Sequence, residues 1–175
     1  MIAFSRPTAD EHAPYFSTYI DKVSGEDALA AIVAQQALLD ALAALPEAKA
    51  GYRYADGKWS VREMIGHLSD TERIFAYRLM RIGRGDRTPL PGFDQDPYII
   101  GGDFEARTLA DVVAEFQAVR AATLALMRPM SAEAAARMGV ANDRPTSARA
   151  IGWMIPGHVI HHAEILRERY GLALT

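Results

Sequence analysis

Apolar residues recur at helical spacing in four segments of the chain, and each segment has start and stop signals. The first segment is 24–47. Ser24 is its expected N-terminal cap, with Asp27 three residues further on, and Pro46 ends it. Its apolar face holds Leu29, Ile32, Val33, Leu39 and Leu42. This pattern predicts an amphipathic helix.

The second segment, 59–85, has the most complete start signal. Ser60 and Glu63 have the spacing of a capping box, in which each side chain accepts a hydrogen bond from the other residue's backbone N–H. Gly83 and Gly85 close this predicted helix, because glycine readily adopts the backbone conformations that end helices.

Two further helices follow in the second half of the chain. The third is 108–130, with a buried apolar stripe, and Pro129 stops it. The fourth is 147–170, with Gly171 as its C-terminal stop. Pro156 lies inside the fourth segment and predicts a kink or a restart there, since proline lacks the N–H of the helical hydrogen bond.

No segment alternates at a period of two, so no strand is expected. Four long amphipathic helices predict an all-α four-helix bundle, with 1–175 as a single domain and 1–23 as an arm that wraps it. The connection 85–107, between helices two and three, is long and rich in proline, glycine and aspartate. Loops of this length in compact domains often act as lids or binding loops. A shorter irregular stretch, 139–147, precedes the fourth helix.

Composition narrows the function classes. Acidic residues outnumber basic ones by 22 to 19, and the basic residues are scattered, which disfavours nucleic acid as a partner. The chain has no cysteine, so any metal must be held by nitrogen or oxygen. It shows neither a signal peptide nor an apolar run long enough to span a membrane. We therefore expect a cytoplasmic protein.

The stretch "PGHVIHHAEILRERYG" holds three of the five histidines. On a helix, His158 and His162 lie one turn and about 40° apart, so both imidazoles can reach one ion at about 2.1 Å. His161 lies on the other side of His158, and the angle favours His162 over it only slightly. The same spacing occurs on packed and solvated faces, so metal binding and simple packing both remain open.

A third histidine ligand has two candidates. His12 lies in the arm and is expected at the surface. His67 lies in the middle of the second helix, in "EMIGHLSDTER", on a polar stripe beside the apolar face. A polar stripe is usually a solvent-facing surface, so the residues alone leave open whether His67 completes a metal site.

Three motifs carry a resemblance to a known family. "GKWSVREMIGHLSDTERIFAYR", "PLPGFDQDPYI" and "GHVIHHAEILRERY" resemble the DinB-like superfamily, in particular its branch of bacterial thiol transferases that act with bacillithiol. The resemblance covers about 52–170. It implies a divalent metal ion, zinc or nickel, bound by His67, His158 and His162, with His161 as a non-ligand. It also implies a homodimer.

Three neutral imidazoles leave a bound ion its full charge and an open position, which lowers the pKa of a bound water or thiol. The resemblance implies a transferase that moves a small thiol onto an electrophilic small molecule. Two alternatives are a hydrolase that uses metal-bound water and a non-catalytic metal-binding bundle. A thiol requirement separates the first two. A closed or covered metal site is expected of the third.

A few side chains are candidates for supporting roles. Asp70, three residues after His67, is the expected hydrogen-bond acceptor for a ligand or a proton carrier, and a surface acid is the alternative. Arg78 can bind an anionic substrate group or pair with a nearby acid. Phe93 and Tyr98, in the long loop, are candidates for an apolar substrate wall or for core packing.

Overall fold

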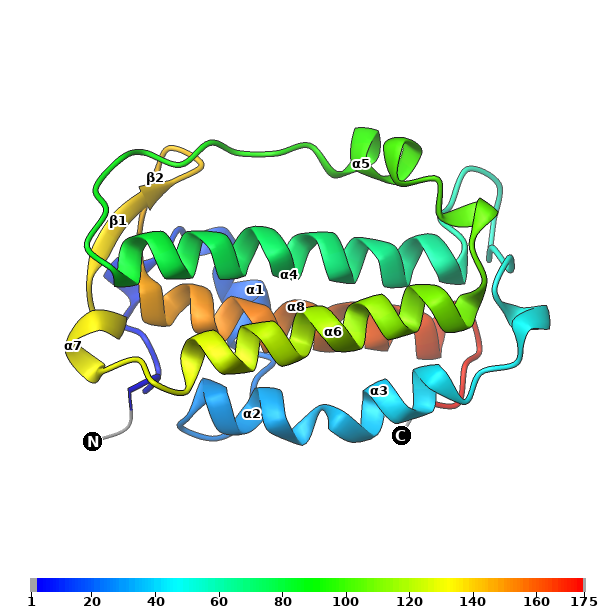
Figure 1. The fold of residues 1–175 in the computed structure, drawn as a ribbon, viewed down its shortest axis with the longest axis horizontal. Coiled ribbons are helices and arrows are strands. Elements are labelled where there is room, and N and C mark those ends of the chain that lie inside the picture. Colours follow the sequence, from blue (N-terminus) through cyan, green and yellow to red (C-terminus); the bar gives the residue numbers. More distant parts are fainter. Residues whose placement is uncertain (1–2, 175) are drawn as a thin grey trace.

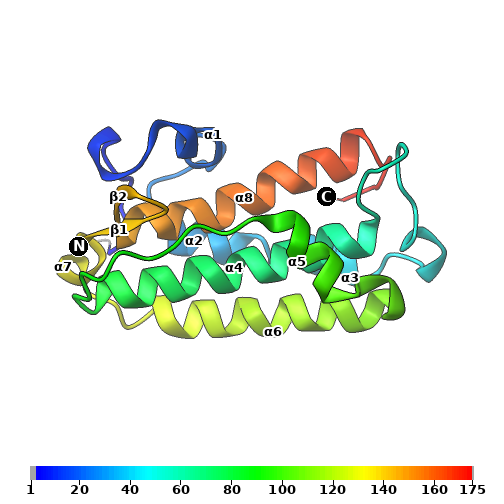
Figure 2. The same ribbon diagram turned by 90° about the horizontal axis from the view of Figure 1, so that it is seen from above.

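The computed structural model describes residues 3–174 and consists mainly of helices that run side by side along one long axis (Figures 1 and 2). The prediction of an all-α four-helix bundle is confirmed. Its long elements are α2 (Ala28–Ala34) with α3 (Gln36–Ala43), α4 (Val61–Gly83), α6 (Leu109–Met127) and α8 (Ala148–Glu168). The α4 helix packs against both α6 and α8 and is therefore the central helix of the bundle.

Short elements connect and cover the bundle. They are the 3-10 turns Ala9–Glu11, Pro14–Phe16, Glu47–Lys49 and Phe104–Ala106, the helices α1 (Ser17–Ile20), α5 (Gln95–Gly102) and α7 (Ala132–Ala135), and the strands β1 (Met138–Ala141) and β2 (Arg144–Ser147). The long connection between α4 and α6 contains α5 and runs along the outside of α4 (Figure 1). None of the helices in residues 3–174 is long and apolar enough to cross a membrane.

The first predicted helix differs from expectation at its start and in its middle. Asp27, not Ser24, caps it, and the Asp27 carboxylate accepts a hydrogen bond from the N–H of Leu29. A start at Ser24 is excluded because Gly25 has a φ of 86°, outside the helical region. Gln35, with a ψ near zero, divides the segment into α2 and α3.

The predicted start of the second helix is confirmed. The capping box of Ser60 and Glu63 is present, with the Glu63 carboxylate 2.7 Å from the Ser60 nitrogen. The restart considered at Pro156 does not occur, because α8 is one helix that continues through this residue. The carbonyl oxygen of Pro156 accepts a hydrogen bond of 2.8 Å from Nε2 of Gln35, so α8 is tied here to the break between α2 and α3.

The expectation of no strand was wrong for the stretch before α8. Strands β1 and β2 form an antiparallel hairpin, with Ala141 opposite Arg144. Asn142 and Asp143 connect them with φ values of 51° and 58°, as a two-residue turn of type I′ requires. Four-residue strands are too short to show a period of two, whereas the Asn-Asp pair is the local signal for such a turn.

A buried polar network crosses the bundle. Arg120 on α6 and Glu72 on α4 form an ion pair of 2.8 Å, and the side chains are only 3% and 2% exposed. Arg120 also donates to Oε1 of Gln35 at 2.8 Å, and Gln35 donates in turn to Pro156. These hydrogen bonds link all four long helical segments through the interior.

The segment before α2 lies along α8, where Figure 2 shows α1 beside that helix. Gly157 permits this close approach, since a Cβ at this position would lie 2.2 Å from the carbonyl oxygen of Tyr19. The indole N–H of Trp153 donates to the carbonyls of Phe4 and Ser5 at 2.9 and 3.0 Å. The arm is thus fastened to the helix that carries the histidine cluster.

Candidate metal centre

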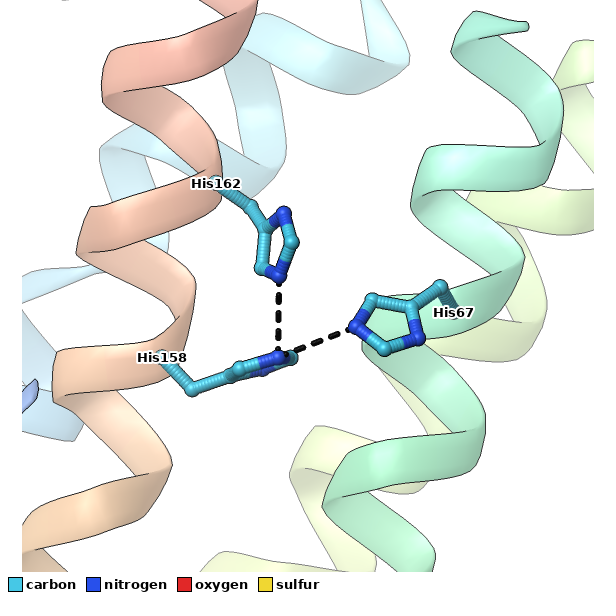
Figure 3. Close-up of side chains that lie close together, drawn as sticks. All are labelled: His67, His158 and His162. Carbon is cyan, nitrogen blue, oxygen red and sulfur yellow. Dashed lines mark hydrogen bonds between the residues drawn. The ribbon is translucent and has the colours of Figure 1, made fainter. Parts of the chain in front are cut away.

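Three histidines from two helices meet between α4 and α8. His67 projects from α4, and His158 and His162 project from consecutive turns of α8 (Figure 3). Nε2 of His158 lies 3.0 Å from Nε2 of His67 and 3.0 Å from Nε2 of His162. All three side chains are buried, with exposures of 4%, 4% and 8%.

Hydrogen bonds alone cannot account for this arrangement. A neutral imidazole nitrogen carries either one hydrogen or one lone pair, so Nε2 of His158 can make only one of its two contacts as a hydrogen bond. A cation removes the conflict because all three nitrogens can then present lone pairs to it. Two nitrogens bound at about 2.1 Å to one ion lie about 3.0–3.4 Å apart, which matches the 3.0 Å from Nε2 of His158 to each of the other two. These residues therefore fit a metal ion.

Burial keeps the three imidazoles neutral. It lowers the pKa of His67 to about 4, with a further contribution from the charge of His161. It lowers the pKa of His162 to about 2, and it holds the pKa of His158 well below its usual value, where the neighbouring histidines add to the effect. The neutral form is the one that binds metals, so the set is ready to bind an ion near pH 7.

The surroundings of the cluster are part polar and part aromatic. Oγ1 of Thr71 lies 3.4 Å from Nδ1 of His67, and this is the only hydrogen bond between described residues to a Nδ1 atom of the cluster. The Trp59 ring packs against His67 with its centroid at 4.8 Å, and the Tyr19 ring meets His158 edge-on at 5.5 Å. These contacts restrict the orientation of the imidazoles.

Asp70 does not contact the cluster through any hydrogen bond between described residues. Its carboxylate instead forms an ion pair of 3.3 Å with Arg73, and burial raises its pKa from the usual value despite that pairing. The role of Asp70 as acceptor or proton carrier stays a prediction. Thr71, one residue further on, has the contact with His67 that was expected of Asp70.

The remaining two histidines lie outside the cluster. His161 is half-buried, and its ring packs against Tyr19 at 5.4 Å. His12 was expected at the surface, but it is only 9% exposed, and its Nδ1 lies 3.0 Å from the carbonyl oxygen of Ala13. The expectation for His12 was wrong because the arm packs closely on α8.

A cavity of about 150 Å³ adjoins the cluster on the side of His67 and His158. Its walls come from the arm, α4, the long loop, the hairpin and α8: Tyr15, Phe16, Tyr19, His67, Thr71, Phe75, Arg78, Phe93, Gln95, Asn142 and His158. Phe93 thus lies at the predicted apolar wall, whereas Tyr98 is not part of it and is 46% exposed. No sequence pattern indicated that the arm and the hairpin form part of the cavity wall, because no local motif relates them to the histidines.

The fold is thus a bundle of four helical segments, with three histidines converging between two of its helices as a candidate metal centre. A family model of the DinB superfamily matches residues 30–166, and the chain belongs to this superfamily. The expected family is therefore confirmed.

One solved structure shows the same fold over nearly the whole chain. YfiT from Bacillus subtilis aligns with a TM-score of 0.68 and 20% identity, covering 95% of this chain and 94% of that chain. It is described as a probable metal-dependent hydrolase with an unusual four-helix bundle topology. No curated protein matches the chain.

Proposed function

We propose that His67, His158 and His162 bind one divalent metal ion and that the protein is a metal-dependent enzyme acting on a small molecule. The observation that carries this proposal is the convergence of three buried Nε2 atoms beside a cavity. When bound, the ion supplies Lewis acidity that lowers the pKa of a coordinated water or thiol towards neutrality. The aromatic side chains that line the cavity shield part of it from bulk water.

Two reactions suit this site. Transfer of a small thiol onto an electrophilic molecule follows from the resemblance to the bacillithiol-dependent branch, and a chain without cysteine needs an external thiol for it. Hydrolysis by bound water is supported by the description of YfiT as a probable metal-dependent hydrolase. In either reaction, Asp70 is our candidate proton carrier. Its carboxylate is paired with Arg73 rather than with a histidine of the cluster, so the proton would pass between Asp70 and the site through water.

A non-catalytic metal-binding bundle is the third candidate, and two observations disfavour it. The ligand group contains three histidines and no fourth His, Asp or Glu among the described residues. The cavity also borders His67 and His158 directly, so a small molecule can approach the ion. A purely structural site would be closed by a fourth ligand.

Zinc and nickel are the ions that we propose, since both bind imidazole well. We propose further that the protein is a cytoplasmic homodimer, as the family resemblance implies. Size-exclusion chromatography with light scattering tests the dimer, and a monomer at micromolar concentration would contradict it.

The first experiment is elemental analysis of protein purified without an affinity tag. We expect about one equivalent of metal in the wild type and its loss in His67→Ala and His162→Ala. His161→Ala is the matched control, because this residue lies on the same turn of α8 outside the cluster and should leave the metal content unchanged. Metal-free wild type, even after incubation with zinc or nickel, would exclude the proposed function.

The second experiment separates the two reactions. The metal-loaded protein is assayed with 1-chloro-2,4-dinitrobenzene in the presence of glutathione, bacillithiol or mycothiol, and with p-nitrophenyl acetate without thiol. Turnover that requires a thiol and disappears in His67→Ala supports the transferase. Ester cleavage without thiol that disappears in the same variant supports the hydrolase.

A further inference from the structure

One face of α4 forms a continuous side of the cavity beside the histidines. His67, Thr71, Phe75 and Arg78 follow one another at spacings of four, four and three residues, and all four line the cavity. His67 and Arg78 are therefore about 20° apart around the helix axis and about 16 Å apart along it. The cavity runs along α4 with the metal ligands towards one end and Arg78 towards the other.

Arg78 is a buried cation without a carboxylate partner. It is 6% exposed, and no acid of the described residues lies within ion-pair distance of it. Its Nη2 donates to the carbonyl oxygen of Pro91 at 2.6 Å, which leaves the other N–H groups of the guanidinium without a hydrogen bond to described residues. Those N–H groups are not enclosed by protein, so they are open to the cavity, and a charge without a carboxylate partner at this position favours an external anion.

The cavity itself favours an anion as well. None of the described residues that line it is acidic. With three neutral imidazoles, a bound divalent ion and Arg78 together give the cavity a charge of about +3. The Phe93 ring lies 5.8 Å from the guanidinium carbon, and Phe75 lies between Arg78 and Thr71 along the helix, so the middle of the cavity is apolar.

These features describe a ligand with three parts. One end carries the group that reaches the ion, a short apolar stretch follows, and the far end carries a negative charge. The volume of about 150 Å³ restricts the ligand to a small organic molecule. A planar guanidinium with free N–H groups matches the geometry of a carboxylate.

We propose that Arg78 binds a carboxylate of the substrate and that the protein acts on small carboxylic acids whose reacting group lies at the opposite end of the molecule. This inference rests on the proposed function, since it assigns the second end of a substrate whose first end reaches the ion. Arg78 also holds the long loop through Pro91. The test must therefore separate anion binding from this structural contact.

The test uses zinc-loaded protein and two series of hydroxamates, which bind zinc whether the enzyme is a transferase or a hydrolase. One series carries a terminal carboxylate and the other a terminal hydroxyl, with two to six methylene groups between the ends. Calorimetry should show that the carboxylate strengthens binding about tenfold or more at the best length, as expected for a charge-assisted pair. Equal affinity of both series at every length would overturn the proposal.

Substitutions at Arg78 supply the control. In Arg78→Met the advantage of the carboxylate should disappear while the hydroxyl series binds as in the wild type, and Arg78→Lys should keep part of the advantage. A uniform loss of affinity for both series would mean that Arg78 only positions the loop, and an advantage that persists in Arg78→Met would place the anion elsewhere. Either result would overturn the proposal.

A second arm works without metal. Hexanoate and 1-hexanol are compared by NMR titration of the metal-free wild type and Arg78→Met. We expect hexanoate to bind the wild type more tightly than 1-hexanol does, and the difference to vanish in the variant. A protein that binds no metal but shows this difference would contradict the proposed function and uphold the anion site, whereas metal binding without the difference would contradict the anion site alone.

Discussion

Thr71 contacts Nδ1 of His67, the ring nitrogen that faces away from the other two histidines. Its hydroxyl oxygen can accept a hydrogen bond from Nδ1 of His67 at 3.4 Å, which leaves Nε2 free to bind the ion. We predict that Thr71→Val lowers metal affinity about 10- to 100-fold, as is typical for loss of such a contact. Competition with a chelator of known affinity measures this effect.

The control for this prediction is Thr123→Val. Thr123 is also a buried threonine, but it lies on α6 and donates to the carbonyl of Val119 at 3.1 Å. Its replacement should leave metal affinity unchanged. Equal affinities of Thr71→Val and the wild type would show that Thr71 does not orient His67.

For single residues, the sequence predicted the position of a side chain correctly where helical periodicity determines it. The four-residue spacing of His158 and His162 indicated that both side chains can point the same way, and the structure brings them together with His67. Spacing could not decide between Asp70 and Thr71 as the neighbour of His67. That choice depends on Arg73, which binds the Asp70 carboxylate.

At the scale of elements, Gly157 determines how closely α1 approaches α8. In most helices a change from glycine to alanine stabilises by about 1 kcal/mol. Here the new Cβ would lie 2.2 Å from the Tyr19 carbonyl oxygen, so Gly157→Ala should destabilise by about 1–3 kcal/mol through displacement of the arm. Urea unfolding measures the change.

The matched variant is Gly101→Ala. Gly101 lies in α5, where a Cβ would meet no atom within 4 Å, so alanine should be neutral or stabilising. A stabilising effect of Gly157→Ala would mean that α1 does not pack on α8 as described.

Glu11 and Arg149 fasten the arm to α8 through a two-pronged ion pair, with Nε of Arg149 2.6 Å from the Glu11 carboxylate. Burial alone would raise the pKa of Glu11, but hydrogen bonds from Arg149, Ser147 and Thr8 outweigh it and lower the pKa from 4.5 to about 2. Because the folded-state pKa is the lower one, the pair stabilises the fold fully above pH 4.5 and loses this effect as the pH falls towards 2.

We therefore predict that Glu11→Gln destabilises the protein by about 1–3 kcal/mol at pH 7. The difference from the wild type should shrink steadily between pH 4.5 and 2, because the wild-type carboxyl then becomes neutral too. Urea unfolding across this pH range tests the prediction. A difference that is constant with pH would exclude the ion pair as its cause.

Sequence patterns predicted the long elements better than the short ones. The helices α4 and α6 have long apolar periods and clear caps at Ser60 and Thr108, so their starts were predicted correctly. The division at Gln35 and the attachment of the hairpin to the long loop involve partners elsewhere in the chain. Gln35 binds Pro156, and Asn142 donates its N–H to the carbonyl of Leu90. Local periodicity contains no information on such partners.

At the scale of the whole molecule, the network through Glu72 and Arg120 holds the four helical segments in register. Removal of one partner leaves a buried charge without compensation, so Arg120→Met should destabilise by about 3–5 kcal/mol. The double variant Glu72→Leu with Arg120→Met should regain much of this loss, because no charge is then left unpaired. Guanidinium unfolding measures both.

Equal destabilisation by the single and the double variant would contradict this account of the network. The partners in it are 48, 85 and 121 residues apart along the chain. The sequence therefore identified the four helices as a bundle but could not indicate which polar groups meet inside it.

The cavity has a further consequence for how such proteins diverge. Its three histidines lie on α4 and α8, inside the bundle, while much of its wall comes from the arm, the long loop and the hairpin. Those outer segments can change in length and side chains without moving a ligand. Substrate preference can then evolve through changes in these outer segments, while the three histidines and the helices that carry them stay the same.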